Sequence, residues 1–475
     1  MKKLLLFLCS ALIIGFISCS SEEPFIDDDI NSGIPTKLDI SQNQLSFSKD
    51  GGENIINITS DGKWILTNND DWCLISPKTG NGNAQIKITL KTNTSDKERL
   101  TEIILKGGNL SQKITVSQDP STSTSKPEVP IKIHVEKAGT LKELIGSRLN
   151  QIENLLLTGS LNGTDIKTIR SMEKLSVIDL SNANIVSGGD SYNIDGNGNY
   201  CYTSNNIISS SMFSDKMNLI SITLPNNITR IGHGAFWGCS KLTSIIIPNK
   251  VEIIEYGAFG ECSSLNSIVL SNSLKEIKDW AFARCYGLKS ISLPNSLIKI
   301  ERPFLECTSL SSITIPSSLI EILSGAFRNC TQLKEFIVEK DNPNFSSTNG
   351  VLCNKDKTIL IAYPNAKGTT YIIPNSILRI EDSAFFNCHN LKSITITENI
   401  RSIGLNSFLD CPNLKDIHVK SKIPPKVIEE YYNELWHAVF DKEINLSATL
   451  YVPKGKYNDY WIAPIWRDFK NIKEE

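Results

Sequence analysis

The sequence has 475 residues, with 49 lysines and arginines against 51 aspartates and glutamates, which gives a formal net charge of −2. A chain of this length can hold several domains. Its balanced charge weighs against nucleic acid as a partner, because proteins that bind nucleic acid usually have a basic surface. Five scattered histidines likewise weigh against a histidine-based catalytic centre or a metal hydrolase.

Residues 1–18 form a predicted secretory signal. Lys2 and Lys3 precede an apolar run, residues 4–17, that is too short for a confident membrane span. Ser18 followed by Cys19 resembles the lipobox of bacterial lipoproteins, which implies cleavage before Cys19 and lipidation of Cys19. The alternative is an ordinary signal peptide with an incidental cysteine.

Residues 19–36 form a predicted acidic tether, because a polar run containing Asp27, Asp28 and Asp29 cannot bury a core. The run also resembles the acidic export signal of some Bacteroidota-type lipoproteins. That resemblance implies a lipid-anchored protein on the outer membrane at the cell surface. A plain spacer is the alternative.

Residues 37–119 are predicted to form a small β-sandwich, because short strand-like runs alternate with Gly/Asp/Asn turns. The expected strands are residues 44–48, 54–59, 63–67, 84–92, 100–105 and 112–118. Lys63-Trp64, Asp71-Trp72, Ser76–Gly80, Arg99 and Ile114–Gln118 resemble the BACON domain. The resemblance implies either carbohydrate or mucin binding or a spacer role. Trp64 and Trp72 suit a sandwich core better than a sugar platform, so no binding residue is assigned there.

Residues 120–130 are a Ser/Thr/Pro linker, and residues 131–185 begin the next domain irregularly. A strand is expected at residues 131–135, a helix at 140–145 capped by Thr140, and a short helix at 165–172. A Gly/Asn-rich loop, residues 187–206, carries Tyr192, Tyr200 and Tyr202 and is either functional or a decorated turn.

A repeated unit dominates the rest of the chain. Its phenylalanine recurs in steps of 23, 23, 23, 22, 23, 58 and 23 residues: Phe213, Phe236, Phe259, Phe282, Phe304, Phe327, Phe385 and Phe408. A cysteine follows each one three residues later except the first, where Lys216 fills the slot: Cys239, Cys262, Cys285, Cys307, Cys330, Cys388 and Cys411. A fixed period in this range predicts a leucine-rich solenoid.

Each unit contains three pieces. A Leu-x-x-Ile-x-Ile/Leu run predicts a short strand, which a proline commonly ends; an apolar pair spaced by three follows; Ala-Phe-x-x-Cys then predicts a tight corner or a single helical turn. The cysteines should form a column of buried thiols. A disulfide ladder or a zinc column is disfavoured, because seven thiols are an odd number and zinc needs four converging ligands.

The repeats are expected over residues 131–422, with an insertion at about 339–373 whose two strands pair across residues 354–357. Residues 423–475 should form a C-terminal cap, with a helix at 428–440, a strand from Thr449 and an aromatic closing segment. These repeats resemble the BspA-like leucine-rich repeats of bacterial surface proteins. The resemblance implies an extended, non-enzymatic surface protein, without a cofactor, that attaches to host proteins or other cells.

The predicted fold class is therefore mainly β, a BACON-like sandwich followed by a leucine-rich-repeat solenoid with short helical turns. One candidate binding surface is a hydroxyl stripe on the strands: Ser221, Ser244, Ser267, Ser290, Ser312 and Ser393. Trp237 and Trp280, outside the repeat consensus, are further candidates. The alternatives are structural: the serines are small enough for crowded neighbouring strands, and the tryptophans pack locally.

The predicted function is recognition of a host or matrix glycoprotein, a mucin or glycan, or another cell through the solenoid. A glycan-capture component of a polysaccharide-uptake system and a structural surface spacer are the alternatives. An enzyme is disfavoured, because the sequence shows no nucleophile elbow, metal triad or paired-carboxylate signature.

Overall fold

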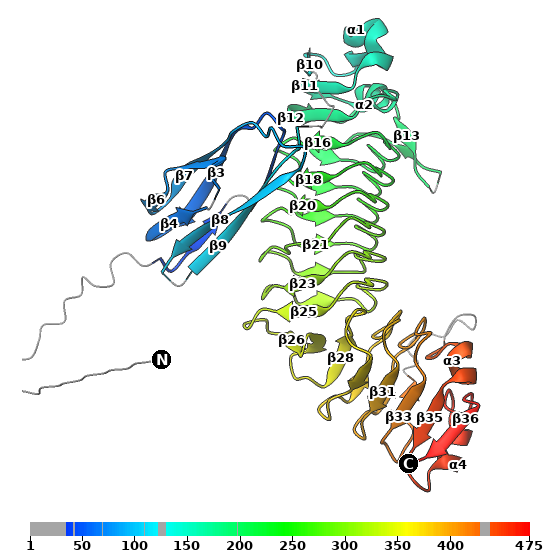
Figure 1. Ribbon diagram of the computed structural model, residues 1–475. Helices are drawn as coiled ribbons and strands as arrows, with labels where there is room; N and C mark the ends of the chain where they lie inside the picture. The colour runs from blue at the N-terminus through cyan, green and yellow to red at the C-terminus, as the bar shows by residue number, and fades with distance from the viewer. Residues whose placement is uncertain are drawn as a thin grey trace, which may run out of the picture. The chain divides into compact units, whose positions relative to one another are not determined.

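The computed structural model describes residues 35–40, 43–68, 70–108, 110–121, 130–196, 198–427 and 438–475. Its contacts divide the chain into two compact units, Met1–Lys126 and Pro127–Glu475. Strands predominate in both units (Figure 1). The mainly-β prediction is confirmed, and each unit is described by itself below.

The first unit is a β-sandwich of two sheets. One sheet has the order β1-β3-β7-β5, and the other has the order β2-β9-β8-β4-β6. The strands are β1 (Leu38–Ile40), β2 (Gln44–Phe47), β3 (Gly52–Ser60), β4 (Lys63–Thr67), β5 (Cys73–Ser76), β6 (Thr79–Asn81), β7 (Ala84–Leu90), β8 (Arg99–Gly107) and β9 (Leu110–Gln118). Alternate side chains of β3 and β4 are buried, as a half-buried strand requires. The short strands β1, β5 and β6 were not expected from the sequence.

The second unit begins with three longer parallel strands, β10 (Ile131–Val135), β11 (Asn154–Leu161) and β12 (Val177–Ile185). Between them lie α1 (Leu141–Ile145), the 3₁₀ helix η2 (Gly146–Gln151) and α2 (Gly163–Arg170). Thr140 is the N-cap residue of α1, as predicted, but its side chain makes no capping bond. The Thr140 hydroxyl donates to the Lys137 carbonyl at 2.8 Å, and the buried Asp165 carboxylate instead accepts from the Leu141 N–H at 2.9 Å.

A typical regular turn then adds two short parallel strands and one corner, although residues 288–294 of one turn form no strand. The Leu-x-x-Ile runs extend the first sheet, in which β12 is followed by β16 (Ser221–Thr223), β18 (Ser244–Ile246) and β20 (Ser267–Val269). Farther along, β23 (Ser312–Ile315) pairs β25 (Glu335–Val338) in a separate two-stranded sheet. The apolar pairs end in a second sheet: β15 (Ile207–Ile208), β17 (Arg230–Ile231), β19 (Ile253–Ile254), β21 (Glu276–Ile277), β22 (Lys299–Ile300) and β24 (Glu321–Ile322). The Gly/Asn-rich loop expected at residues 187–206 contains a hairpin of β13 (Asn193–Ile194) and β14 (Tyr200–Cys201).

The corners stack into a column. Phenylalanine rings from Phe213 to Phe327 lie nearly parallel, with neighbouring centroids 5.1–5.8 Å apart. Each thiol from Cys239 to Cys330 donates to the phenylalanine carbonyl of the preceding corner at 3.1–3.2 Å. All ten cysteines in the described part of the chain are free and buried. The prediction of a buried thiol column is confirmed.

The insertion divides the solenoid core. Its strands β26 (Phe345–Thr348), β27 (Val351–Asn354) and β28 (Ile359–Ala362) form an antiparallel meander, as predicted for the last two. Val351 and Cys353 belong to the core of the following turns, whereas Leu352 between them belongs to the core of the preceding turns. Strand β27 is thus buried on both faces and separates two apolar cores.

The later turns continue the same pattern to the C-terminus. Their strands are β29 (Thr370–Ile372), β30 (Arg379–Ile380), β31 (Ser393–Ile396), β32 (Ser402–Ile403), β33 (Asp416–Val419), β34 (Lys426–Val427), β35 (Thr449–Val452) and β36 (Asn471–Glu474), with helices α3 (Lys442–Ser447) and α4 (Tyr457–Ile462). Buried Tyr460, Trp466 and Phe469 close the second core. Most of the predicted 428–440 helix lies outside the described residues, and β36 follows the strand expected to be last.

Candidate binding surface

The serine stripe lies on the outer face of the first sheet. Ser221 pairs with Ser244, and Ser244 pairs with Ser267, while the isoleucines that follow them are buried. Farther along, Ser312 pairs with Glu335 and Ser393 with Asp416, so carboxylates interrupt the row. Ser290 is exposed but lies outside any strand. The structure therefore places Ser221, Ser244 and Ser267 in one row, whereas the other three serines lie outside that sheet.

The row beside the serines carries exposed aliphatic side chains. Ile246 is 54% exposed, Ile337 47% and Ile372 69%. They alternate with hydroxyl residues, because Ile337 pairs with Thr314 and Ile372 pairs with Thr395. The outward sides of these strands, which belong to three separate sheets, consequently carry both hydroxyl and aliphatic side chains.

Trp237 lies across the backbone of the next corner. A Cβ atom added to Gly257 or to Gly260 would collide with the indole ring, so these two glycines leave the space that the ring occupies. The ring is half-buried. Glycine at these two positions thus holds the tryptophan in one place against the solenoid.

Tyr256 connects the two candidate tryptophans. It lines the same groove as Trp237, and it stacks on Trp280 with ring centroids 5.5 Å apart. The His233 ring meets Tyr256 edge-on at 5.0 Å. Sequence reasoning missed Tyr256 and His233, although both occupy the slot three residues before the corner phenylalanine.

A groove of about 740 Å³ separates the β13–β14 hairpin from this aromatic cluster. The hairpin contributes Asn193 and Asp195, and the corners contribute Asp215, Trp237 and Tyr256. The Asn193 amide donates to the Ser211 carbonyl at 3.3 Å and to the Ser214 hydroxyl at 3.2 Å, which fixes the hairpin to the corner column. The groove therefore has a polar hairpin side and a solenoid side that carries both aromatic rings and Asp215.

A second groove of about 310 Å³ lies on the other side of the hairpin. It shares Asp195 and His233 with the first groove. Tyr200 and Tyr202 line it and are 66% and 56% exposed. The expected loop is thus a hairpin that carries exposed aromatic residues between two grooves, whereas its third tyrosine, Tyr192, is buried.

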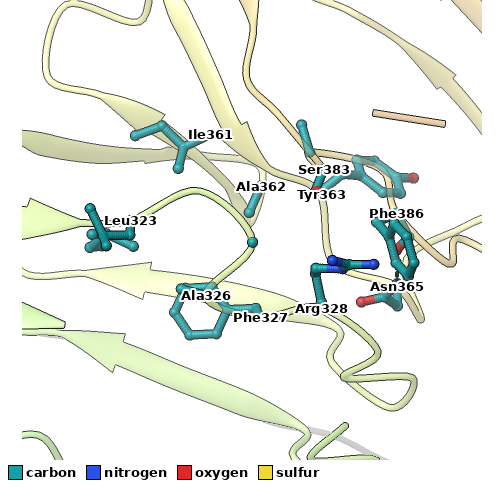
Figure 2. A pocket seen from close by; sticks show the side chains of 13 residues that line it. Leu323, Ala326, Phe327, Arg328, Ile361, Ala362, Tyr363, Asn365, Ser383 and Phe386 are labelled. Atoms are coloured by element: carbon teal, nitrogen blue, oxygen red, sulfur yellow. Dashed lines mark hydrogen bonds between the residues drawn. The ribbon is translucent and has the colours of Figure 1, made fainter. Parts of the chain in front are cut away.

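A smaller cavity lies where the insertion meets the corner column (Figure 2). The Arg328 guanidinium lies 3.8 Å from the centre of the Phe386 ring, and burial lowers the pKa of Arg328. The space measures about 20 Å³, enough for about one water molecule. This cavity is a gap in packing at the junction and offers no room for a larger ligand.

Burial makes the corner thiols poorly reactive. Burial raises the pKa of the Cys239 and Cys330 thiols to about 12, which keeps them protonated and unreactive at neutral pH. Among the described residues, no group of three or more His, Cys, Asp or Glu side chains is placed to hold a metal ion.

The tryptophans of the first unit are not open platforms. Trp64 is 3% exposed, and its indole N–H donates to the Gly82 carbonyl at 2.8 Å. Trp72 is partly buried under the Arg99 guanidinium, 4.3 Å from the ring centre. The prediction that Trp64 and Trp72 pack the sandwich core is confirmed.

The proposed lipidation residue, Cys19, lies outside the described residues. A search of the described helices for one long and apolar enough to cross a membrane found none.

Comparison with known families supports both units. The model of the "BspA type Leucine rich repeat region" matches in six copies, at residues 206–334 and 361–435. The BACON model, described as "Putative binding domain, N-terminal", matches residues 62–119. A search of curated proteins gave no match.

Several solved structures of bacterial repeat proteins are similar to this chain. A leucine-rich repeat protein from Eubacterium ventriosum is 23% identical, with 50% of this chain and 67% of that one covered and a TM-score of 0.40. A leucine rich cell surface protein from Faecalibacterium prausnitzii is 24% identical, with 58% and 84% covered and a TM-score of 0.39. A leucine-rich repeat protein from Bacteroides ovatus is 19% identical, with 69% and 78% covered and a TM-score of 0.40.

In the second unit, the repeat matches agree with the stacked corners of the structure. In the first unit, the BACON match agrees with the two-sheet sandwich. The chain thus carries BspA-type leucine-rich repeats in its second unit and a BACON domain in its first.

Proposed function

We propose that this protein is a non-enzymatic cell-surface lipoprotein that recognises host or matrix glycoproteins, or other cells, through its solenoid. The observation that carries the proposal is a set of exposed aliphatic side chains on the strands that the Leu-x-x-Ile runs and their counterparts form. Ile246, Ile337 and Ile372 are exposed on three such strands, which belong to three separate sheets of the solenoid. Aliphatic side chains on a rigid surface can supply the apolar part of an interface with a partner. The buried core beneath keeps the face ordered before binding, which lowers the ordering cost of association.

Binding of whole cells to immobilised mucin and fibronectin tests this surface. We expect the triple variant Ile246→Thr, Ile337→Thr and Ile372→Thr to weaken attachment by roughly 10-fold or more, because burial of aliphatic area is removed while strand propensity is kept. The matched control is Ile298→Thr with Ile320→Thr, two exposed isoleucines beside the second sheet. Equal loss in both variants, or none in the triple variant, would contradict the proposal.

The proposed anchor is lipidated Cys19 on the outer membrane, with the acidic tether holding the folded units outside the cell. External protease on intact cells tests this placement. Digestion of the natural protein, together with release of Cys19→Ala into the medium, would support it. Complete protection in intact cells would place the solenoid in the periplasm and remove the attachment role.

The aromatic groove beside the β13–β14 hairpin favours a second candidate, a glycan-capture component of a polysaccharide-uptake system. Trp237 and Tyr256 line that groove together with Asp195 and Asp215. Growth on single polysaccharides separates the two candidates, because an uptake component is needed for growth on its own glycan whereas an attachment protein is not. A surface spacer would neither attach cells to mucin or fibronectin nor be needed for growth on any polysaccharide.

A further inference from the structure

The groove between the β13–β14 hairpin and the corner column presents a preformed aromatic wall. Gly257 and Gly260 hold the Trp237 ring against the solenoid, and Tyr256 continues the wall to Trp280. Tyr256 and Trp280 are 40% and 39% exposed, so ring surface remains available to a ligand. A wall fixed in this way loses little side-chain freedom on binding.

The indole N–H of Trp237 makes no hydrogen bond within the part of the chain that the structure describes. By contrast, the indole N–H of Trp64 donates to the Gly82 carbonyl and that of Trp466 donates to the Pro425 carbonyl, at 2.8 and 2.9 Å. Tryptophan N–H groups usually find a partner when buried. The Trp237 donor beside the groove is therefore available to an acceptor on a ligand.

Carboxylates line the groove from both the hairpin and the corner column. The Asp195 carboxylate accepts from the Asn199 N–H at 2.8 Å and from the Asn199 side-chain amide at 3.2 Å, which orients it at the tip of the hairpin. Asp215 lines the groove from the corner column and is exposed. Each ionised carboxylate has about four lone-pair sites, so both retain capacity to accept from hydroxyl groups.

The lining charges are informative about the ligand. Asp195 and Asp215 are the acidic side chains that line the larger groove, and the nearby Arg230 is paired with Glu255 at 3.0 Å. The half-buried Arg170, which interacts with Asp215, donates to the Ser211 and Ser214 carbonyls. An anionic ligand would meet two like charges without a free cation among these lining residues. A groove that offers both aromatic ring faces and carboxylate acceptors suits a ligand with apolar C–H faces and many hydroxyl groups.

We propose that this groove binds a neutral oligosaccharide, with a sugar ring stacked on Trp237 and its hydroxyls bonded to Asp195 and Asp215. The inference rests on the proposed recognition role and names the ligand chemistry of one part of the solenoid. The smaller groove shares Asp195 and His233 and carries exposed Tyr200 and Tyr202. A chain of several sugars can therefore continue past the hairpin, which favours an oligosaccharide over a single sugar.

Calorimetry with the full chain tests the proposal, using cellohexaose, mannohexaose and chitohexaose as neutral probes and chondroitin sulfate as the anionic probe. We expect at least one neutral probe to bind and the sulfated probe not to bind. Trp237→Ala should weaken binding by roughly 10-fold or more, because the stacking surface is lost. The control is Trp461→Ala, which removes a tryptophan 51% exposed on α4.

Two further variants keep the test independent of folding. Gly260→Ala should displace the indole and weaken binding with Trp237 still present, because the added Cβ would collide with the ring. Asp215→Asn should reduce discrimination against chondroitin sulfate, because one repelling charge is removed. Thermal melting of each variant identifies any that fails to fold.

The outcomes separate this inference from the proposed function. Loss of neutral-probe binding in Trp237→Ala but not in Trp461→Ala supports the inference, whether or not cells attach to mucin. Absence of binding to all three neutral probes overturns it, and attachment that persists in those cells would leave the recognition role intact. Salt-sensitive binding of oligolysine to the groove, without sugar binding, would overturn it in favour of a cationic peptide.

Discussion

Lys216 fills the slot that cysteine occupies in the later repeats and makes the corresponding bonds with a longer side chain. Its amine donates to the carbonyl oxygens of Ile169, Arg170 and Met172, at the end of α2. In the later turns a thiol reaches the carbonyl of the preceding corner. The first regular turn stacks on a helix end rather than on another corner, and a lysine side chain spans that longer gap.

Replacing Lys216 with methionine should lower the free energy of unfolding by about 2–3 kcal/mol, because carbonyl oxygens lose a buried donor. The matched control is Lys241→Met, whose exposed amine bonds the Asn218 side chain at 2.9 Å. That control should change the free energy of unfolding by less than about 0.5 kcal/mol. Urea unfolding followed by circular dichroism measures both, and equal losses would contradict the role assigned to Lys216.

The residue before each cysteine slot adopts a left-handed backbone. Its φ lies between 55° and 73° at every regular corner: Asp215, Gly238, Glu261, Arg284, Glu306, Asn329, Asn387 and Asp410. This conformation costs most L-residues about 1–2 kcal/mol, and glycine or asparagine adopts it with less strain. The repeating corner therefore imposes a conformational preference that the sequence meets fully only at some turns.

At Glu306, with φ of 59°, asparagine and valine should have opposite effects. We expect Glu306→Val to be about 1–2 kcal/mol less stable than Glu306→Asn, because a β-branched side chain is strained at positive φ. The ion pair of Glu306 with Arg284 is lost in both variants, so the comparison cancels it. Thermal melting measures the difference, and indistinguishable melting temperatures would show that the corner relaxes.

The corner column is the element that sets the pitch of the solenoid. Stacked phenylalanine rings and thiol donors recur together because both come from the Ala-Phe-x-x-Cys unit. Their spacing in the sequence predicted this column. The second sheet was read only as an apolar pair, because strands of two residues such as β17 and β19 become visible through their pairing partners rather than through their own periodicity.

The buried thiols should make the solenoid sensitive to alkali. Folding raises the pKa of Cys330 from about 9 to about 12, so only the unfolded chain releases this proton as the pH rises above about 9. The stabilisation is complete below about pH 9 and is lost toward pH 12, at about 1.4 kcal/mol per pH unit for each thiol. Other buried repeat thiols shift in the same direction.

Unfolding free energies measured between about pH 8 and pH 10.5 check this dependence. Cys330→Ala should have a lower free energy of unfolding at pH 8. That free energy should fall less steeply with rising pH than in the natural chain, by the contribution of about one proton. Val251→Ala, another buried core truncation, should lower stability without changing the slope. The same slope in Cys330→Ala and the natural chain would contradict the pKa shift of that thiol.

The hairpin and its groove mark the limit of what the sequence predicted at the element scale. Trp237 and Trp280 were identified because they depart from the repeat consensus. Their connection through Tyr256 is a contact between adjacent corners, whereas the wall opposite them depends on where the β13–β14 hairpin folds back. No periodicity records that contact, because the hairpin lies outside the repeats, and the groove was visible only once the chain was folded.

At the scale of the second unit, β27 separates two cores that should unfold separately. Phe282 belongs to the first core and Phe408 to the second. Phe282→Ala should cost about 3–5 kcal/mol and speed hydrogen exchange in β18, β20 and β21, while β31, β33 and β35 remain protected. Phe408→Ala should show the reverse pattern. Faster exchange throughout the unit in either variant would show that the two cores unfold as one.

The unit-level architecture was predictable, and the partition of its core was not. Eight registered copies of the corner phenylalanine required stacking, and the 58-residue step located the insertion. That β27 would be buried on both faces depends on Leu352 and Cys353 pointing to opposite cores. Alternation along a strand predicts opposite directions, but the occupant of each side is known only from the folded chain.

The packing of Trp237 on Gly257 and Gly260 restricts how the number of repeats can change in evolution. Because most corners bond to their neighbours in the same way, unequal recombination that deletes one whole turn would rejoin equivalent partners and preserve the column. The turns bearing Trp237 and the two glycines are an exception, since the indole needs both glycines in the adjoining copy. These two turns must be inherited together, while their neighbours can be gained or lost.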